Sequence, residues 1–398
     1  MSLSRRLKPF LALAVVAALS VAAFCAFATS EKVVFPIGGY SGDPARDQAA
    51  GFTVAGPTYG DKEELLAACE AIGMPLIYNI GMPIDFLGRS GEPVAEVDFD
   101  EVRREIRRQV EAVADREVIT TWYLTPEELR NWKPLEMEYL QVAAETIRSA
   151  DPRQRPVWMY EPGHRTHGAL AKTAPFQDIL GKGVYTNYAG RRTERTWVAW
   201  TLDQQARAIA EANPTAIPYG ILEMFKRSNE TWDPETVARW VRHDAYASLV
   251  SGVKGIVIFS FGRRPGFYPG STEWDAYYHA WSAVAGELNG SRQLGAVFLK
   301  GQPVDPPAFE VVEGSAMTLL SGRKGSPTET VEVPSFTTTA FRWKGKTWWF
   351  VVNSSEDPLA FKLPASGPDW KPLLEGQPDI RQGMLQLPPL AVGAWSSR

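Results

Sequence analysis

The sequence predicts a (β/α)8 TIM barrel followed by a small C-terminal antiparallel β-sandwich. Eight β-branched or aromatic runs alternate with helix-like segments between residues 33 and 288. From about Gly295 this alternation stops, and short strand patterns separated by Pro, Gly and Ser replace it. The chain of 398 residues has room for one barrel of about 250 residues and a smaller second domain. An open, doubly wound sheet is the alternative arrangement of the same alternating elements.

The alternating elements follow one another without a gap. The expected barrel strands are residues 33–40, 52–55, 75–80, 118–125, 156–160, 183–187, 216–223 and 256–261. The expected helices are residues 43–50, 61–72, 99–114, 135–150, 168–180, 200–212, 234–250 and 277–288. Asp61 and Gly73 fit the start and the end of the second helix, and Pro234 fits the first turn of the seventh.

The C-terminal region shows the alternation of half-buried strands. Residues 338–343 and 347–352 are two such strands, with Lys344-Gly345-Lys346 as the turn between them. Similar short strands through the rest of the region predict a β-sandwich that braces the barrel. Carbohydrate binding through Trp348 or Trp349 is the alternative role.

The N-terminus has the pattern of a bacterial signal peptide. Basic residues precede an apolar run at residues 10–24, and Ala26-Phe27-Ala28 supplies small residues for cleavage after Ala28. The expected segments are a signal peptide at 1–28, a barrel at 29–292 and a sandwich at 293–398. The mature protein would be periplasmic or secreted, whereas an uncleaved signal anchor is the alternative. No other segment is long and apolar enough to cross a bilayer.

The charge balance excludes some classes of partner. Loss of the three basic residues Arg5, Arg6 and Lys8 with the signal peptide changes the formal net charge from −4 to −7. An acidic protein of this kind is not expected to bind nucleic acid or an anionic membrane surface. Cys69 would be the one remaining cysteine, so no intrachain disulfide is expected, and its apolar helical surroundings predict a core residue.

Two glutamates follow barrel strands at the places where chemistry is expected. Functional groups of a TIM barrel lie at the C-terminal ends of its strands. Glu127 follows the fourth strand, and Glu223 ends the seventh. Glycoside hydrolysis needs two carboxyl groups, one that protonates the leaving oxygen and one that attacks or activates water. Side-chain alternation places Glu127 on one face with Tyr123.

Other interpretations of the same residues remain open. Thr125-Pro126-Glu127-Glu128 is also the pattern of a helix start, with Thr as N-cap and Pro at the first position. Glu128, which follows Glu127, and Glu161, at the end of the fifth strand, are the alternative candidates for the acid. Glu223 would need a partner if it were buried, and Lys226 or Arg227 stands close in sequence.

The run Trp122-Tyr123-Leu124-Thr125-Pro126-Glu127-Glu128 resembles the end of strand four in the retaining barrel glycosidases called clan A, which often read Trp-Tyr-Leu-x-Asp-Glu-Pro. The resemblance covers residues 33–290 and implies that Glu127 is the acid/base and Glu223 the nucleophile. Pro126 departs from it, because Asn or Asp usually precedes the acid/base. A non-catalytic, glycan-binding barrel is therefore the second hypothesis.

A carbohydrate substrate needs polar and aromatic side chains around the two carboxyls. The residues expected to bind it are Tyr40, Tyr59, Tyr123, Tyr160, Glu161, His164, Tyr185, Asn187 and Arg263. His164 and His167 lack the accompanying ligands of a metal site, so neither metal nor cofactor is expected. No Ser-His-Asp constellation stands out, and His243 is expected to be packed or at the surface.

Overall fold

The computed structural model describes residues 33–82, 84–86, 94–226, 229–262, 272–323, 327–364 and 369–397. The expected signal peptide and Arg263 lie outside the described residues. The chain divides into two units, residues 1–34 and 35–398, and the fold below is that of the second unit.

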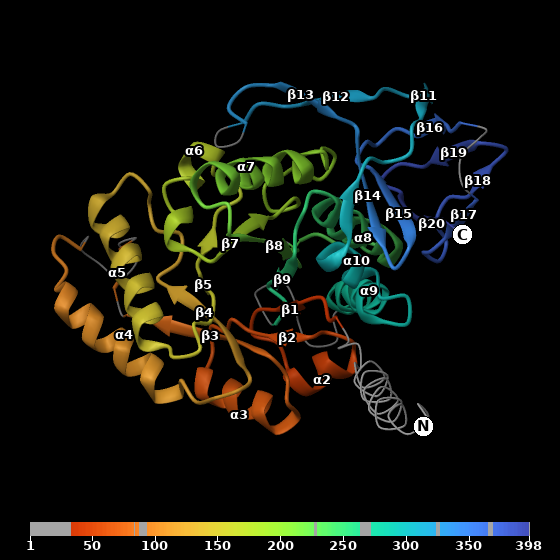
Figure 1. Cartoon of the computed structure of the whole chain (residues 1–398). Helices are drawn as coiled ribbons and strands as arrows, with labels where there is room; N and C mark the ends of the chain where they lie inside the picture. Colours follow the sequence, from red (N-terminus) through yellow and green to blue (C-terminus); the bar gives the residue numbers. More distant parts are fainter. Residues whose placement is uncertain are drawn as a thin grey trace, which may run out of the picture. The chain divides into compact units, whose positions relative to one another are not determined.

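A parallel sheet forms the first part of this unit (Figure 1). Its strands are β1 (Ile37–Gly39), β2 (Val54–Ala55), β3 (Leu76–Gly81), β4 (Ile119–Thr125), β5 (Val157–Trp158), β6 (Tyr160–Glu161), β7 (Ile179–Val184), β8 (Ile217–Glu223) and β9 (Gly255–Phe259). They are ordered β5-β4-β3-β2-β1-β9-β8-β7-β6. The fifth barrel strand is split into β5 and β6, since the Met159 N–H bonds the Gln177 side chain at 2.8 Å. Its two halves pair with β4 and with β7, which closes the barrel. The closed barrel is thus confirmed.

Helices separate consecutive strands of the barrel, where β5 and β6 count as one strand. They are α2 (Pro44–Ala49), α3 (Lys62–Ile72), α4 (Phe99–Val113), α5 (Pro134–Ala150), α6 (His167–Leu170), α7 (Trp197–Ala212), α8 (Pro234–Val250) and α9 (Thr272–Asn289). The caps of α3 are confirmed: Asp61 accepts from the N–H groups of Glu63 and Glu64, and Gly73 ends the helix with a φ of 67°.

The fifth helix and the sixth barrel strand differ from the sequence prediction. The expected helix 168–180 is only the single turn α6 and a 3-10 turn at Ala174–Phe176. Strand β7 begins at Ile179 rather than residue 183, because Ile179–Val184 pairs in register with β8. Tyr185 and Asn187 therefore lie in the loop beyond the strand.

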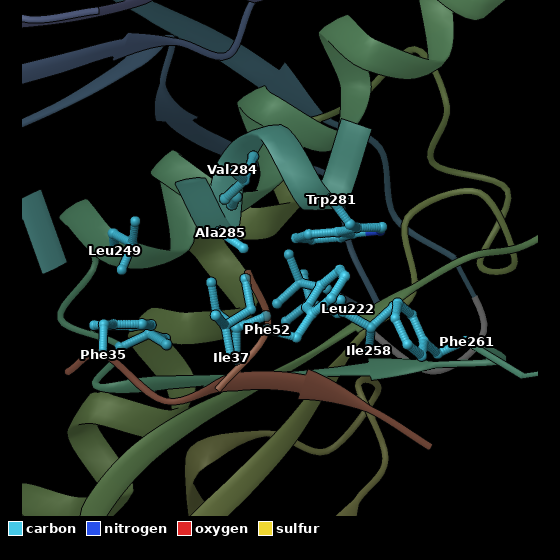
Figure 2. Packing of buried hydrophobic residues seen from close by; sticks show 14 of the residues in the cluster. Phe35, Ile37, Phe52, Leu222, Leu249, Ile258, Phe261, Trp281, Val284 and Ala285 are labelled. Carbon is cyan, nitrogen blue, oxygen red and sulfur yellow. The ribbon is translucent and has the colours of Figure 1, made fainter. Parts of the chain in front are cut away.

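Two apolar layers hold the barrel together. Inward-facing side chains from all eight strand positions fill its centre, and they are Tyr40, Val54, Ile77, Tyr123, Trp158, Tyr160, Ile179, Ile221 and Val257. Glycine makes room for the large rings, since a Cβ at Gly183 would lie 2.5 Å from the Tyr160 hydroxyl oxygen. Figure 2 shows the outer layer, where Trp281 and Ala285 of α9 face Ile37 and Ile258 of the sheet. Cys69 is fully buried there, as predicted.

The C-terminal part forms the predicted sandwich. One sheet has the order β10 (Gln302–Val304), β14 (Phe336–Trp343), β15 (Lys346–Asn353), β20 (Val392–Ser397) and β17 (Trp370–Pro372). The other has the order β11 (Glu310–Glu313), β16 (Leu359–Lys362), β19 (Met384–Leu387) and β18 (Ile380–Arg381). A ribbon of β12 (Met317–Leu320) and β13 (Val331–Pro334) extends from them. The expected turn is confirmed, with Lys344 and Gly345 at φ 47° and 76°.

Two details of this region correct the sequence interpretation. Strands do not begin at Gly295, because residues Leu294–Lys300 form helix α10, whose Phe298 packs on Phe350 with ring centroids 4.4 Å apart. Trp349 is 1% exposed inside the sandwich, and Trp348 is 9% exposed on its barrel side. Sugar binding through either tryptophan is therefore wrong, and their contacts support the bracing role.

Candidate active site

Glu127 and Glu223 belong to the C-terminal ends of two barrel strands. Glu223 is the last residue of β8, and its side chain follows the inward-facing positions of Tyr219 and Ile221. Glu127 lies two residues beyond β4, on the face of Tyr123. The helix-start interpretation of Glu127 is wrong, because helix α5 begins only at Pro134, with Lys133 as its N-cap.

Tyrosine hydroxyls surround the Glu127 carboxylate. The Tyr59 hydroxyl donates to its Oε1 over 3.2 Å, and the Tyr123 hydroxyl donates to its Oε2. The Tyr40 hydroxyl in turn donates to that of Tyr123 over 3.2 Å. Burial, with the negative charge of Glu127, raises the pKa of all three phenols, so they remain protonated donors. Glu127 as a residue is partly exposed to solvent.

Glu223 occupies a drier environment. Glu223 is only 5% exposed. Its carboxylate accepts hydrogen bonds from the backbone N–H groups of Asn187 and Tyr188, the latter at 3.2 Å. Burial raises the pKa of Glu223 to about 8, although the two N–H groups oppose this effect. Lys226 is not its partner, because the Lys226 Nζ atom lies 3.4 Å from Glu273. Arg227 lies outside the described residues.

A buried polar chain, which sequence reasoning missed, stands behind Glu223. Arg195 donates to Asn187 Oδ1 at 2.9 Å and to Asp244 Oδ2 at 2.5 Å. Asp244 Oδ1 lies 2.7 Å from His243 Nδ1, and His243 Nε2 lies 2.9 Å from Ser354 Oγ. The structure thus does assemble a Ser-His-Asp constellation, but all three residues are buried. No local sequence signal announces the polar chain, because its members come from three separate segments, at residues 187–195, 243–244 and 354.

Aromatic rings cover the rest of the barrel mouth. Tyr185 stacks on Tyr160 and on Phe259, with centroid distances of 5.6 and 4.9 Å. Tyr59 stacks on Tyr40 at 5.5 Å. Tyr59 and Tyr188 are 59% and 61% exposed, so each offers a ring face or edge to a ligand. Flat apolar rings with hydroxyl groups suit the faces and hydroxyls of a sugar.

The backbone departs from ordinary geometry at the same end of the barrel. Ser41, Glu128 and Ser260 are not glycines, yet they have φ values of 54°, 61° and 58°. They follow strands β1, β4 and β9 respectively. Left-handed conformations of such residues cluster at functional sites, where the surrounding structure holds them in place.

Glu161 is placed differently from the other expected residues. Its carboxylate is fully buried, and it accepts from Arg165 and, at 2.7 Å, from Gln177 Nε2. With these contacts Glu161 forms a structural ion pair, and it is not placed to bind a sugar or to act as the catalytic acid. His164 lies exposed on the loop that follows β6. Of the expected binding residues, the tyrosines and Asn187 are brought together, whereas Glu161 is turned away from the mouth.

Comparisons with known proteins give the fold. No protein-family model and no curated protein matches the chain. Among solved structures, Amy13B of Eubacterium rectale is similar with a TM-score of 0.54 and 11% identity, over 92% of this chain and 94% of that one. An alpha-amylase from Anoxybacillus has a TM-score of 0.50 and 10% identity, over 91% of this chain and 97% of that one. These likenesses show a barrel followed by a C-terminal β domain.

No helix within the described ranges is long and apolar enough to span a membrane. Within the same ranges, no three His, Cys, Asp or Glu side chains gather as a metal site would require.

Proposed function

We propose that this protein is a glycoside hydrolase that cleaves an oligo- or polysaccharide, with Glu127 and Glu223 as its two catalytic carboxyls. The observation that carries the proposal is the position of both carboxyls at the C-terminal ends of barrel strands, beneath exposed tyrosines. The resemblance of residues 122–128 to the clan A glycosidases and the fold shared with an alpha-amylase both support it.

The proposed reaction is a double displacement with retention. Glu223 attacks the anomeric carbon while Glu127 protonates the departing glycosidic oxygen, which forms a glycosyl ester on Glu223. Glu127, now a carboxylate, removes a proton from water while the water oxygen attacks the anomeric carbon. This attack breaks the ester bond and releases Glu223 as a carboxylate. The two N–H groups that reach Glu223 stabilise its carboxylate when it leaves.

The raised pKa of Glu223 favours a second distribution of roles. A carboxyl group with a pKa of about 8 holds its proton at neutral pH, as a general acid must. Glu127, which accepts two phenol hydrogen bonds, would then attack or activate water. The pH profile of kcat/KM separates the two assignments. Activity rises through about pH 8 if Glu223 is the nucleophile, and it falls there if Glu223 is the acid.

The function is tested by release of reducing ends from a panel of α- and β-linked polysaccharides. We expect release from at least one of them, and its loss in both E127Q and E223Q while the variants remain folded. Polysaccharide binding without release would instead establish the non-catalytic glycan-binding barrel. Release that survives in either variant, or neither binding nor release, would contradict the proposal.

We also propose that the protein is exported after cleavage behind Ala28, because residues 1–28 have the charge and hydropathy pattern of a signal peptide. An exported enzyme would meet polysaccharides outside the cytoplasm, which agrees with the proposed substrate class.

A further inference from the structure

The loop that carries the two N–H donors to Glu223 is held from behind by a continuous chain of hydrogen bonds. Asn187 accepts from Arg195 through Oδ1 and donates to the Tyr277 hydroxyl at 3.1 Å through Nδ2. The Asn187 side chain is therefore fixed on both sides, and the backbone N–H of Asn187 donates to the Glu223 carboxylate. Arg195 is fully buried, and its guanidinium lies 4.6 Å from the Trp240 ring centroid. Its placement leaves Asn187 little freedom.

The chain continues into the C-terminal β domain. Asp244 joins Arg195 to His243, and both acid and histidine belong to α8 of the barrel. His243 then contacts Ser354, which directly follows β15 of the sandwich. Ser354 is fixed in turn, because its N–H donates to the Ser335 carbonyl at 2.8 Å. A continuous path of hydrogen bonds thus joins the sandwich to the loop at Glu223.

The β domain reaches the same loop at a second place. Arg191 donates to the Ser321 carbonyl at 2.7 Å, and Arg323 donates to the Gly190 carbonyl at 2.6 Å. Both Ser321 and Arg323 follow β12 of the two-stranded ribbon. The Glu194 carboxylate accepts hydrogen bonds from the guanidinium groups of both Arg191 and Arg323, at 2.7 and 3.2 Å. The ribbon therefore holds the loop at residues 190–194, and Asp244 holds it at Arg195.

We propose that Arg195 and Asp244 are positioning residues for Glu223, and that the chain through His243 and Ser354 makes the C-terminal β domain part of the active-site scaffold. This inference rests on the proposed catalytic role of Glu223. The N–H groups that donate to the Glu223 carboxylate belong to Asn187 and Tyr188 of the barrel, and the β domain holds the loop that carries them.

The charges of the chain also act on the Glu223 proton. Asp244 on α8 raises the pKa of Glu223, whereas Arg195, in the loop before α7, lowers it. Tyr277 of α9 faces the same carboxyl, and its burial beside Glu223 raises the pKa of its phenol, so it stays neutral. His243 is kept towards its neutral form, because burial lowers its pKa. Removal of the Asp244 charge should therefore change the pKa of Glu223 more than removal of any other charge in this chain of hydrogen bonds.

The first experiment follows the titration of Glu223 by carbon NMR of protein labelled at the glutamate carboxyl carbons, with E223Q for assignment. D244N removes the nearby negative charge, so we expect the apparent pKa of Glu223 to fall by about one pH unit. D151N is the matched control, because Asp151 is a buried acid paired with Arg155 at 2.7 Å, outside this chain of contacts. An unchanged titration in D244N, or an equal shift in D151N, would overturn the proposal.

The second experiment tests the link to the β domain with S354A, which removes one hydroxyl and should fold even if D244N does not. We expect amide hydrogen exchange in residues 185–196 to become about ten-fold faster in S354A, while exchange in α5 stays unchanged. D151N should leave residues 185–196 as they are. If the loop of S354A exchanged at the rate of the parent protein, the proposal that the β domain is part of the active-site scaffold would be wrong. Both readouts are made without substrate, so a failure of the proposed hydrolysis leaves them interpretable.

Discussion

The Tyr59 hydroxyl lies 3.2 Å from Oε1 of Glu127 and bridges the loop after β2 to the end of β4. Strand β3 stands between those two strands in the sheet, so the contact crosses a strand rather than following one. Tyr59 is exposed, whereas the second donor, Tyr123, is fully buried. Glu127 thus has one fixed donor from below and one donor that a bound sugar can reach.

The Y59F variant tests the importance of this outer hydrogen bond. Phe retains the stack on Tyr40 but loses the donor, so we expect kcat to fall about ten-fold, with an unfolding free energy within about 0.5 kcal/mol of the parent. Steady-state kinetics and urea unfolding measure the two quantities. Y78F is the control, because the Tyr78 hydroxyl donates to Glu63 away from the barrel mouth. Equal kinetic losses in Y59F and Y78F would contradict a specific role for Tyr59.

The proton on Glu223 should be visible in the stability of the protein. Its pKa is raised from 4.5 to about 8, so the folded state keeps a proton that the unfolded state has lost. The unfolding free energy should therefore decline as the pH rises between these two values, by at most about 1.4 kcal/mol per pH unit. E223Q is neutral throughout, so its stability relative to the parent should increase over this range and then level off.

Urea unfolding of E223Q and the parent at about pH 5, 7 and 9 measures this difference. A difference that stays constant across the three conditions would show that Glu223 ionises normally. It would also remove the argument for Glu223 as the proton donor.

The proposed export makes a prediction about the N-terminus. When the full chain is expressed in a bacterium with a general secretory pathway, the mature protein should begin at Thr29 and lie outside the cytoplasm. N-terminal sequencing and cell fractionation check both points. Replacement of Ala26 and Ala28 by larger residues should leave the precursor uncut. A full-length chain held in the membrane would instead establish the signal-anchor alternative.

Local signals allowed most of the barrel to be predicted. Asp61 and Gly73 set the ends of α3 through their own geometry, and apolar runs fixed most strands within a few residues. Strand β7 was misplaced because two of its six residues are glycines, which weaken a strand pattern. The reason for the two glycines appears only in the structure, because the rings of Trp158 and Tyr160 occupy the space that a Cβ at either position would need. Helix α10 was missed for a similar reason, since seven residues give little periodicity.

The site divides in the same way. Glu127 and Glu223 were located because each stands at the end of an apolar strand, a pattern that short stretches of sequence contain. The roles of Glu161 and of the Arg195–Asp244 pair depend on side chains from other segments. Spacing along one sequence does not carry that information, so the sequence does not single out Arg165 as the partner of Glu161.

Asp151 offers a stability test on the opposite side of the pH scale. Hydrogen bonds from Arg155 and from Trp122, the latter at 2.9 Å, outweigh burial and hold the pKa of this carboxyl well below its ordinary 3.8. A depressed pKa adds stability above the unfolded value, and this stability is lost as the pH falls towards the folded one. D151N leaves the buried Arg155 unpaired and should cost roughly 3–5 kcal/mol at neutral pH.

That cost should be constant between about pH 5 and 9 and should shrink below about pH 4, where the parent also loses its carboxylate contribution. Urea unfolding of D151N and the parent from about pH 3 to 7 measures it. The D151N variant thus loses its deficit in acid, whereas the advantage of E223Q appears towards alkaline pH. If the D151N deficit instead persisted unchanged in acid, lost packing around Trp122 rather than lost charge would be its cause.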